Sequence, residues 1–378
     1  MEIPWVIEEQ TKVKHELLKR YIRPWMAILY STQKKFNLLE VLLYFDGFSG
    51  PGIYYEDEKK ETTCLGSPLI VAEAANDYTE AESKRKLNMF LIDKDSKCVE
   101  ILRKHINEMN KFNQDWIVFN AEFEQKIHEI LNELDKKRLS TQPMFFFIDP
   151  FGYSGFPIKT LERILKYPRA ELFINFMIYD IARFCEEQQF EAKLNELYGN
   201  NEYKNVSKCS TPETRQAYLL NLYCKSLKEI AKAEFVMPFR VNTPDKGTRP
   251  RYYLIHASKN LKALKVMKDN MGKVSDNEYR FEAIGIATKQ MSLFEDPGKI
   301  ELIERIKGYC ATRITDKIAY EEIEDWAYTN TDGVSKTIKE SLLILEINNI
   351  IKIERQPRQQ KSTVTKGAKI NYIGGKQI

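Results

Sequence analysis

The chain has 378 residues and a mass of 44.4 kDa, a length that predicts two domains, or one large domain with an appendage. Apolar residues make up 43% of it, and 58 Lys and Arg against 54 Asp and Glu leave a formal charge of only +4, which argues against general disorder and against a histone-like polycation. No apolar run is long enough to span a bilayer and no signal peptide stands at the amino terminus, so we expect a cytoplasmic protein without a membrane span. The six cysteines include no C-x-x-C pair, so we expect neither a structural zinc site nor a disulfide framework.

An amphipathic helix and a buried strand are expected first. Apolar residues recur at helical spacing over residues 11–30, with Lys and Arg on the other face, and Pro24 predicts a kink or a break in this helix. The continuous apolar run 41–46 follows and ends in a glycine-rich loop. Such a run is typical of a central parallel strand that is covered on both faces.

Strands and helices then alternate along the chain. Further strands are expected at 89–92, 116–119, 144–148 and 171–176, and helices at 68–75, 97–110, 124–136, 159–165, 181–197 and 212–233. This alternation predicts an α/β fold with a Rossmann-like, doubly wound and mostly parallel sheet, and the last two helices form a helical insert at about 180–233. A hairpin of 235–241 and 251–256 would end the sheet, and an antiparallel hairpin at this place is a feature of class I methyltransferase folds.

The carboxy-terminal part follows a different pattern. A linker-like stretch at 287–299 precedes three short helices and a hairpin. The helices are expected at 300–310, 320–328 and 334–346, and the hairpin strands at 350–355 and 368–373. Three helices followed by a β-hairpin describe a winged helix. The sequence therefore predicts a first domain at 1–295 and a winged-helix domain at 296–378.

The glycine-rich string from Asp46 to Gly52 is the first candidate for a functional site. Its spacing differs from the dinucleotide fingerprint and fits S-adenosylmethionine (SAM) better, because SAM has no pyrophosphate to place at a helix terminus. Phe48, Gly50 and Gly52 would shape the turn around the cofactor, and Asp46 would meet its cationic amino-acid end. The alternative is a tight strand-to-helix turn that binds no ligand.

Polar residues also end the second and third strands. Asp93 is expected to accept hydrogen bonds from ribose hydroxyls, as carboxylates at the tip of the second strand typically do, whereas Asp95 could equally cap the following helix. Asn120 is expected to contact the adenine amino group of the cofactor. A capping role at the next helix is the alternative for Asn120.

The fourth strand ends in Asp149, Pro150 and Phe151, where catalysis would take place. A carboxylate at this edge of a doubly wound sheet faces the crevice in which ligands bind. The order Asp-Pro-aromatic partly matches the D-P-P-Y motif of amino-group methyltransferases, in which the Asp and a backbone carbonyl accept hydrogen bonds from the target amine. Phe151 would stack on the target base, or it is only a hydrophobic plug. The match is partial, because the second proline of the motif is absent and Gly152 follows Phe151.

Basic residues concentrate in the predicted recognition helix and wing. These candidates for nucleic-acid binding are Lys336, Lys339, Arg355, Arg358, Lys361, Lys366 and Lys369. Cations placed there would suit the phosphates of DNA or RNA. The alternatives are a solvated tail and a protein-binding winged helix, and Glu340 and Glu346 weaken the electrostatic argument.

In combination, these strings resemble the three-Cys-motif partner (TcmP) family. The matching segments are KHELLKRYIRPWMAIL at 14–29, YFDGFSGPGIY at 44–54, GSPLIVAEA at 66–74, FFFIDPFG at 145–152 and ELFINFM at 171–177, with weaker echoes at 251–260 and 289–294. The resemblance implies a class I methyltransferase-like fold. It also implies a partner, because the family is named for being encoded beside a radical-SAM-like protein with a three-cysteine motif.

The leading hypothesis is a SAM-dependent methyltransferase-like protein that acts on nucleic acid with this partner, and no residue is predicted to bind a metal. A second hypothesis is a non-catalytic docking partner of the three-Cys-motif enzyme. A third is a metal-dependent nuclease or nucleotide hydrolase that uses Asp46, Asp93 and Asp149. The four histidines lie in no triad or metal-ligand context.

Overall fold

The computed structural model describes residues 3–79, 84–109, 114–242, 250–275, 282–283, 297–314 and 316–374. The chain divides into two compact units. Unit 1 comprises Met1–Val266 and Ala283–Ile286, and unit 2 comprises Met267–Glu282 and Ala287–Ile378. The domain boundary predicted between residues 295 and 296 lies outside the described residues.

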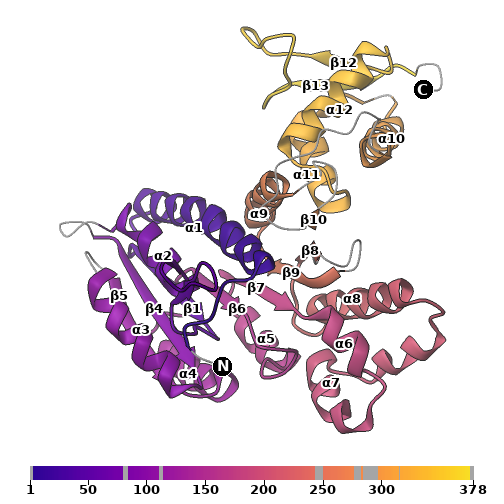
Figure 1. The fold of residues 1–378 in the computed structure, drawn as a ribbon. Helices are drawn as coiled ribbons and strands as arrows, with labels where there is room; N and C mark the ends of the chain where they lie inside the picture. Colours follow the sequence, from indigo (N-terminus) through magenta and orange to yellow (C-terminus); the bar gives the residue numbers. More distant parts are fainter. Residues whose placement is uncertain are drawn as a thin grey trace. The chain divides into compact units, whose positions relative to one another are not determined.

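Unit 1 is built on a mostly parallel sheet (Figure 1) with the strand order β10-β8-β9-β7-β6-β1-β4-β5. The strands are β1 (Val41–Asp46), β4 (Lys86–Asp93), β5 (Gln114–Asn120), β6 (Met144–Ile148), β7 (Ala170–Phe176), β8 (Phe235–Asn242), β9 (Pro250–Ser258) and β10 (Glu282–Ala283). Strand β1 pairs in parallel with β4 on one side and with β6 on the other, so the chain reverses its winding direction there. The predicted mostly parallel sheet is confirmed, and the topological switch point lies at the carboxyl ends of β1, β4 and β6.

An antiparallel edge completes the sheet beyond β7. Strand β9 runs antiparallel to β7 and to β8, which confirms the predicted hairpin. With the strands β1, β4, β5, β6, β7, β8 and β9 counted one to seven, the order across the sheet is 3-2-1-4-5-7-6. A parallel sheet of this order with a hairpin at its edge is the methyltransferase-like arrangement that the sequence predicted.

Helices cover both faces of the sheet, as a doubly wound fold requires. The helices between the first strands are α1 (Glu9–Lys35), α2 (Ser67–Asn76), α3 (Ser96–Met109), α4 (Phe123–Lys136) and α5 (Ile158–Leu165). Val41, Leu43 and Phe45 of β1 join the core formed with α4 and α5. On the other face, Tyr21 of α1 packs on Phe145 of β6, with ring centroids 5.5 Å apart. Helix α1 continues through Pro24, so the alternative of a break at that residue is wrong.

The helical insert lies between β7 and β8 and is more divided than predicted. It comprises α6 (Ile178–Phe184), η1 (Gln188–Phe190), α7 (Glu191–Tyr198), η2 (Glu202–Lys208) and α8 (Pro212–Glu229). Figure 1 shows α6, α7 and α8 grouped beside α5. The single helix predicted over 181–197 is wrong, because the chain leaves the helical path after Phe184. Thr211 is the N-cap residue that precedes α8. Its hydroxyl accepts a hydrogen bond from the backbone nitrogen of Thr214 in a capping box.

A small hairpin follows the glycine-rich turn, and the sequence did not predict it. Its strands are β2 (Ile53–Tyr55) and β3 (Thr63–Leu65), and an acidic stretch at 56–61 forms the connection. The amino-terminal segment pairs with β2 through a parallel bridge between Val6 and Tyr55. This pairing attaches the start of the chain to the residues directly after the turn.

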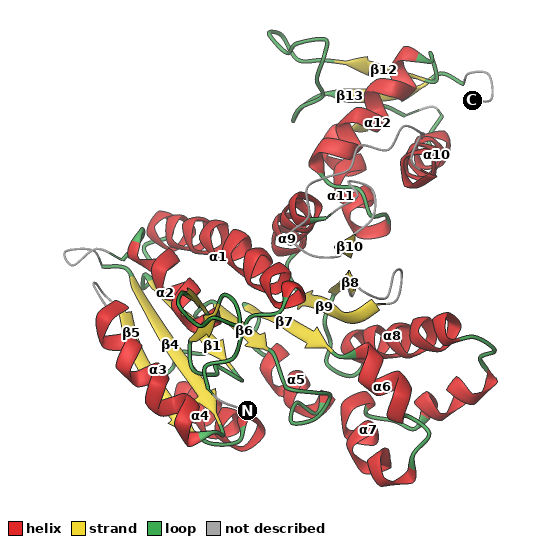
Figure 2. Ribbon diagram, viewed as in Figure 1, coloured by secondary structure: helices red, strands yellow, loops and turns green. Residues whose placement is uncertain are grey.

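The described residues of unit 2 form helices and a small antiparallel sheet (Figure 2). Its elements are α10 (Pro297–Ala311), β11 (Ile318–Ala319), α11 (Tyr320–Asn330), α12 (Ser335–Ile347), β12 (Ile351–Glu354) and β13 (Lys369–Tyr372), with the sheet order β11-β13-β12. Helix α9 (Leu261–Val274), which the sequence did not predict, begins in unit 1 and ends in unit 2. None of the helices in the described ranges is long and apolar enough to cross a membrane.

Candidate functional site

The glycine-rich turn joins the end of β1 to β2 at the switch point. Gly50 and Gly52 have φ angles of +58° and +78°, a left-handed conformation that favours glycine. A Cβ atom at Gly52 would lie 2.6 Å from Cδ1 of Leu102, so a larger residue would also collide with α3. Phe48 is half-buried, with its ring 5.5 Å from that of Phe123. The predicted turn therefore exists and has the backbone geometry for close contact with a ligand.

Asp93 holds this turn in place. Its Oδ2 accepts a hydrogen bond of 2.8 Å from the backbone nitrogen of Gly50, and its Oδ1 accepts one of 2.8 Å from that of Asp95. Burial raises the pKa of the Asp93 carboxyl. Each carboxylate oxygen has a second lone pair, so Asp93 can still accept from a hydroxyl of a ligand.

Asp46 is fully buried at the end of β1. Its Oδ1 accepts from the backbone nitrogen of Phe48 at 3.3 Å, and its Oδ2 accepts from the hydroxyl of Tyr44 at 3.2 Å. Burial raises the pKa of Asp46 to about 7, a hydrogen bond from Ser67 opposes this shift, and the nearby charge of Asp149 adds to it. The side chain thus supports the turn from within and takes up a proton near neutral pH.

Asn120 ends β5 next to the end of β4. Its side-chain nitrogen donates to the backbone oxygens of Asp93 at 3.1 Å and Lys94 at 2.9 Å. The residue as a whole is exposed. The structure therefore places all the predicted cofactor-binding residues along one edge, at the ends of β1, β4 and β5.

Asp149 follows β6 and makes two contacts that the sequence did not predict. Its Oδ2 forms an ion pair with the ammonium group of Lys14 on α1, and its Oδ1 accepts a hydrogen bond of 2.7 Å from the side-chain nitrogen of Asn175. The side chains of Lys14 and Asp149 are only 8% and 13% exposed. The carboxylate is therefore held between α1 and β7 with a fixed orientation.

Lys14 is the main functional candidate that sequence reasoning missed. The helical pattern over residues 11–30 predicts every lysine on the face opposite the apolar residues. However, Lys14 precedes Leu18, Tyr21 and Trp25 by four, seven and eleven residues, so it lies in line with buried side chains of α1. This spacing is the sequence signal that Lys14 is buried. Its neighbour His15 is also buried, and burial together with the charge of Lys14 lowers the pKa of His15 to about 3, which leaves the ring neutral.

Pro150 and Phe151 lie in different environments. Pro150 is buried, whereas Phe151 is 80% exposed. Among the ring pairs of the described residues, Phe151 contacts one other ring, that of Trp5 in the amino-terminal segment. The ring centroids are 5.2 Å apart. An exposed aromatic ring beside a strand-end carboxylate is available to stack on a ligand.

The predicted nucleic-acid-binding residues of unit 2 fall into two groups. Arg355 is engaged within the unit, because its guanidinium binds Glu346 at 2.6 Å and the backbone oxygens of Thr363 and Lys361. By contrast, the connection between β12 and β13 exposes Arg358, Lys361 and Lys366, and β13 exposes Lys369.

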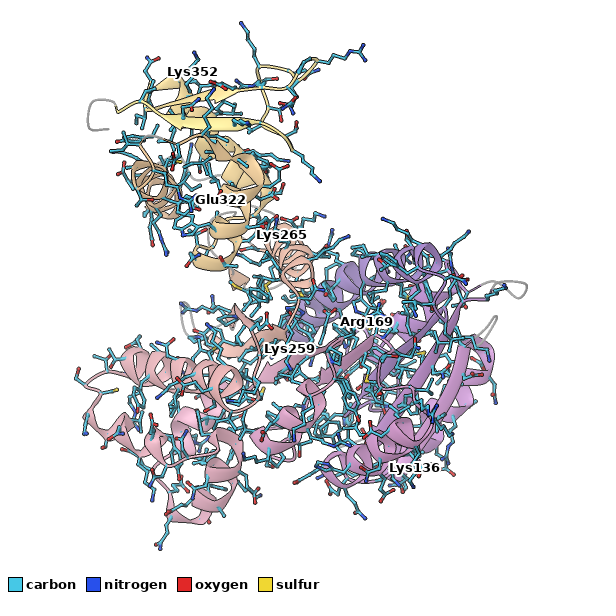
Figure 3. The ribbon with its side chains drawn as sticks, turned by 180° about the vertical axis from the view of Figure 1, so that it is seen from behind. Lys136, Arg169, Lys259, Lys265, Glu322 and Lys352 are labelled. Carbon is cyan, nitrogen blue, oxygen red and sulfur yellow. The ribbon has the colours of Figure 1, made fainter. Side chains whose placement is uncertain are left out.

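The two lysines of α12 complete the set. Lys336 is exposed, 4.0 Å from Glu340, and Lys339 is half-buried. Figure 3 shows a further basic residue, Lys352, on β12, and this side chain is exposed. Exposed cations of unit 2 therefore lie on the connection between β12 and β13 and on the two strands themselves, whereas Arg305, Arg313, Lys317 and Lys336 are exposed elsewhere in the unit, each within 4.0 Å of a glutamate.

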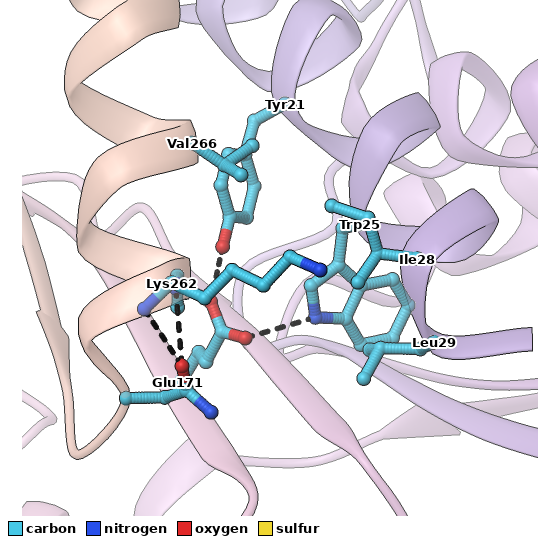
Figure 4. A pocket seen from close by; sticks show the side chains of 9 residues that line it. Tyr21, Trp25, Ile28, Leu29, Glu171, Lys262 and Val266 are labelled. Carbon is cyan, nitrogen blue, oxygen red and sulfur yellow. Dashed lines mark hydrogen bonds between the residues drawn. The ribbon is translucent and has the colours of Figure 1, made fainter. Parts of the chain in front are cut away.

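A separate pocket lies at the opposite edge of the sheet, at the amino end of β7 (Figure 4). Its buried carboxylate, Glu171, accepts hydrogen bonds from Tyr21, from Trp25 at 3.2 Å and from His256 at 3.1 Å. No predicted site residue lines it. These contacts attach α1 to the sheet, and α1 carries Lys14.

The described residues contain no group of three or more His, Cys, Asp or Glu arranged to hold a metal ion.

Comparisons with known proteins give only distant likenesses to solved structures. No family model and no curated protein matches the chain. Solved structures with some similarity include protein LPL1258 of Legionella pneumophila strain Philadelphia 1, from the family DUF519, at 13% identity over 67% of this chain and 85% of that one, with a TM-score of 0.39. An O-methyltransferase of Bacillus cereus in complex with SAH is 12% identical over 64% of this chain and 80% of that one, with a TM-score of 0.32.

The structure of PKMT2 from Rickettsia typhi is also similar, at 12% identity over 93% of this chain and 75% of that one, with a TM-score of 0.30. Scores this low support no argument about activity or substrate. The methyltransferase-like assignment concerns the fold and rests on the strand order.

Proposed function

We propose that the protein is a SAM-dependent methyltransferase acting on an amino group of a nucleic acid. The observation that carries this proposal is the hydrogen bond between Asp93 at the end of β4 and the backbone nitrogen of Gly50, at the same sheet edge as the Asp149 carboxylate, which follows β6 on the other side of β1. It combines a left-handed glycine turn, a carboxylate for a ribose and a second carboxylate for a target group at the place where doubly wound sheets bind ligands.

The residues present fit the cofactor. Gly50 and Gly52 allow the backbone to approach it closely, and Asp93 keeps free lone pairs for the ribose hydroxyls. Asn120 lies exposed beside Asp93, where adenine would lie. Asp46 is fully buried and its pKa is raised to about 7, so it would support the turn from within and would not contact the cationic amino-acid end as the sequence predicted. Bound there, SAM would supply an electrophilic methyl group.

The chain's own residues would position the target amine. Asp149, oriented by Lys14 and Asn175, and the backbone oxygen of Pro150 would accept hydrogen bonds from the amine, so that its lone pair points at the methyl carbon. Phe151 would hold the ring that carries the amine. Methyl transfer from a sulfonium needs little acid–base assistance, and correct placement can supply most of the rate enhancement.

Unit 2 would hold the substrate. Its three helices and β-hairpin follow the order of a winged helix, and Arg358, Lys361, Lys366 and Lys369 offer exposed cations for phosphates. The resemblance to the TcmP family extends the proposal to a partner, a radical-SAM-like protein with a three-cysteine motif, in the cytoplasm.

SAM binding is the first test, by calorimetry and thermal shift on the full chain. A ligand at 100 times its dissociation constant stabilises the folded state by about 2.7 kcal/mol. Asp93→Ala should weaken SAM binding at least tenfold. Asp115→Ala, which removes an exposed carboxylate at the other end of the strands, should not. If the wild-type chain bound no SAM but co-eluted with the three-Cys-motif protein, the docking role would replace the enzymatic one.

Methyl transfer is the second test, with radiolabelled SAM and cellular DNA and RNA as acceptors. Asp149→Ala should abolish incorporation while leaving SAM affinity within a few-fold, and Asp115→Ala should be as active as wild type. Undiminished methylation of every acceptor by Asp149→Ala would contradict the proposed role of this carboxylate. Magnesium-dependent cleavage of the acceptor would instead indicate the nuclease.

A further inference from the structure

The amino-terminal segment lies across the candidate cofactor turn. The backbone oxygen of Trp5 accepts a hydrogen bond of 2.8 Å from the nitrogen of Tyr55, and the nitrogen of Ile7 donates one of 2.8 Å to the oxygen of the same residue. These bonds add the segment to β2 as a short parallel partner. The position of Trp5 is therefore set by backbone pairing with residues that directly follow the turn.

The indole ring of Trp5 stands between the turn and the end of β6. A Cβ atom built at Gly50 would lie 3.7 Å from Cζ3 of Trp5. On the other side, Trp5 and Phe151 meet at 5.2 Å with an angle of 72° between their rings. Tyr54 flanks the indole at 6.2 Å. One ring from the amino-terminal segment and one from the loop after β6 thus form a corner, and Phe151 follows Asp149 by two residues.

We propose that Trp5 is a specificity-determining residue, and that the Trp5–Phe151 corner selects a planar heteroaromatic ring bearing an exocyclic amine over a flexible aliphatic amine. This inference rests on the proposed function and assigns to Trp5 a part in selecting its nucleobase. Two nearly perpendicular rings accept a flat ligand that stacks on one of them and presents its edge to the other. An aliphatic ammonium cannot stack and would bind this corner only through a cation–π contact, worth about 0.5–1 kcal/mol at an exposed site, against about 1–3 kcal/mol for a stacked base.

The open face of Phe151 supports this assignment. The ring is 80% exposed, although it is large and apolar and follows a fully buried strand. Phe36, after α1, is exposed to a similar extent, 63%, but has no second ring beside it among the ring pairs of the described residues. Phe36 lies at the other end of the sheet, before β1, and it provides a matched control.

The test measures binding, so that it does not depend on turnover. Trinucleotides of adenylate and of cytidylate, whose bases carry exocyclic amines, are titrated against the full chain, with a lysine-containing tripeptide for comparison. Saturating S-adenosylhomocysteine and high salt reduce contributions from the cofactor site and from phosphate contacts. Calorimetry measures the affinity of every variant, because the fluorescence of residue 5 is lost in Trp5→Leu and Trp5→Phe.

We expect Trp5→Leu and Phe151→Leu to weaken trinucleotide binding by about 5- to 100-fold, the range given by loss of one stacking contact. Trp5→Phe should recover part of the affinity, and Phe36→Leu should match wild type. Thermal unfolding confirms that each variant is folded. Equal trinucleotide affinity of Trp5→Leu and wild type, or equally strong binding of the tripeptide, would overturn the inference.

The two proposals fail in different ways. If wild type transfers methyl groups to a nucleic acid and Trp5→Leu binds trinucleotides normally, the corner is not the specificity element and the proposed function stands. If Trp5→Leu loses trinucleotide binding but no SAM binds to wild type, the corner recognises bases and the methyltransferase proposal is wrong.

Discussion

Lys14 of α1 and Asp149 at the end of β6 form an ion pair in which both side chains are almost fully removed from solvent. A buried pair gains little net stability, but loss of one partner leaves an uncompensated charge in a region of low polarity. The pair also connects the first helix to the strand end that we propose as the methyl-transfer site. Stability and activity are therefore coupled at this contact.

Replacement of Lys14 by methionine should destabilise unit 1 by about 3 kcal/mol, because Asp149 would stay buried without a counter-charge. Lys12→Met removes an exposed pair with Glu9 on the same helix and should cost less than about 0.5 kcal/mol. Urea titrations with thiol labelling of Cys98, a buried cysteine of unit 1, report this unfolding separately from unit 2. A cost for Lys14→Met as small as that for Lys12→Met would show that the pair is not buried in solution.

Asp46 should make the stability of unit 1 fall as pH rises from about 4 to 7. Its folded pKa is about 7 against 3.8 for the free side chain, so in this window the folded state holds a proton that the unfolded chain has lost. The stabilisation is complete below the lower value and is lost as pH rises through the upper one. Its slope is at most about 1.4 kcal/mol per pH unit.

Asp46→Asn should remove this slope, which the urea midpoint of Cys98 labelling measures between pH 5 and pH 8. The matched control is Asp115→Asn, which changes an exposed carboxylate of the same unit and should leave the slope as in wild type. An unchanged slope in Asp46→Asn would mean that another group of unit 1 titrates in this range.

Gly52→Ala should destabilise unit 1 by about 1–3 kcal/mol and abolish SAM binding. The alanine would have to adopt the left-handed φ of Gly52, and its Cβ would collide with Leu102.

Gly308→Ala is the opposite case. Gly308 lies within α10 with nothing within 4 Å of its Cβ position, so alanine should stabilise unit 2 by about 0.5–1 kcal/mol. Labelling of Cys98 and of Cys310, which is buried in unit 2, separates the two effects.

The exposed basic residues of unit 2 should control the salt dependence of nucleic-acid binding. Arg358→Ala, Lys361→Ala and Lys366→Ala should each lower the slope of log affinity against log salt by about 0.9 on duplex DNA, or about 0.7 on single strands, if each contacts one phosphate. Fluorescence anisotropy over a salt series measures this slope. Unchanged slopes in all three variants would favour a protein-binding role for unit 2.

Arg355→Ala should act through stability instead. Its guanidinium is bound by Glu346, and this hydrogen-bonded pairing lowers the pKa of Glu346. Loss of Arg355 should therefore lower the urea midpoint of Cys310 labelling, whereas Arg358→Ala, which removes an exposed side chain, should leave it unchanged. A normal midpoint in Arg355→Ala, with a lowered salt slope, would place this residue with the phosphate-binding group.

The sequence by itself determined the sheet, the alternation of helices and the edge where the candidate site lies. The runs at β1, β6 and β7 are apolar throughout, and only a strand covered on both faces accepts such a composition. Once the strands are parallel, their carboxyl ends share an edge. For this reason the sequence predicts that Gly50, Asp93 and Asp149 lie at one edge of the sheet.

Tertiary structure decided which partner each polar or aromatic side chain has. Lys14 matched a buried position of its helix, but the pattern could not show that Asp149 balances its charge. Trp5 reaches the glycine turn only because its backbone pairs with β2, and Arg355 turns from a phosphate candidate into a partner of Glu346. Periodicity is a local property that identifies the buried face of an element, whereas these contacts join residues from separate elements and depend on how those elements pack.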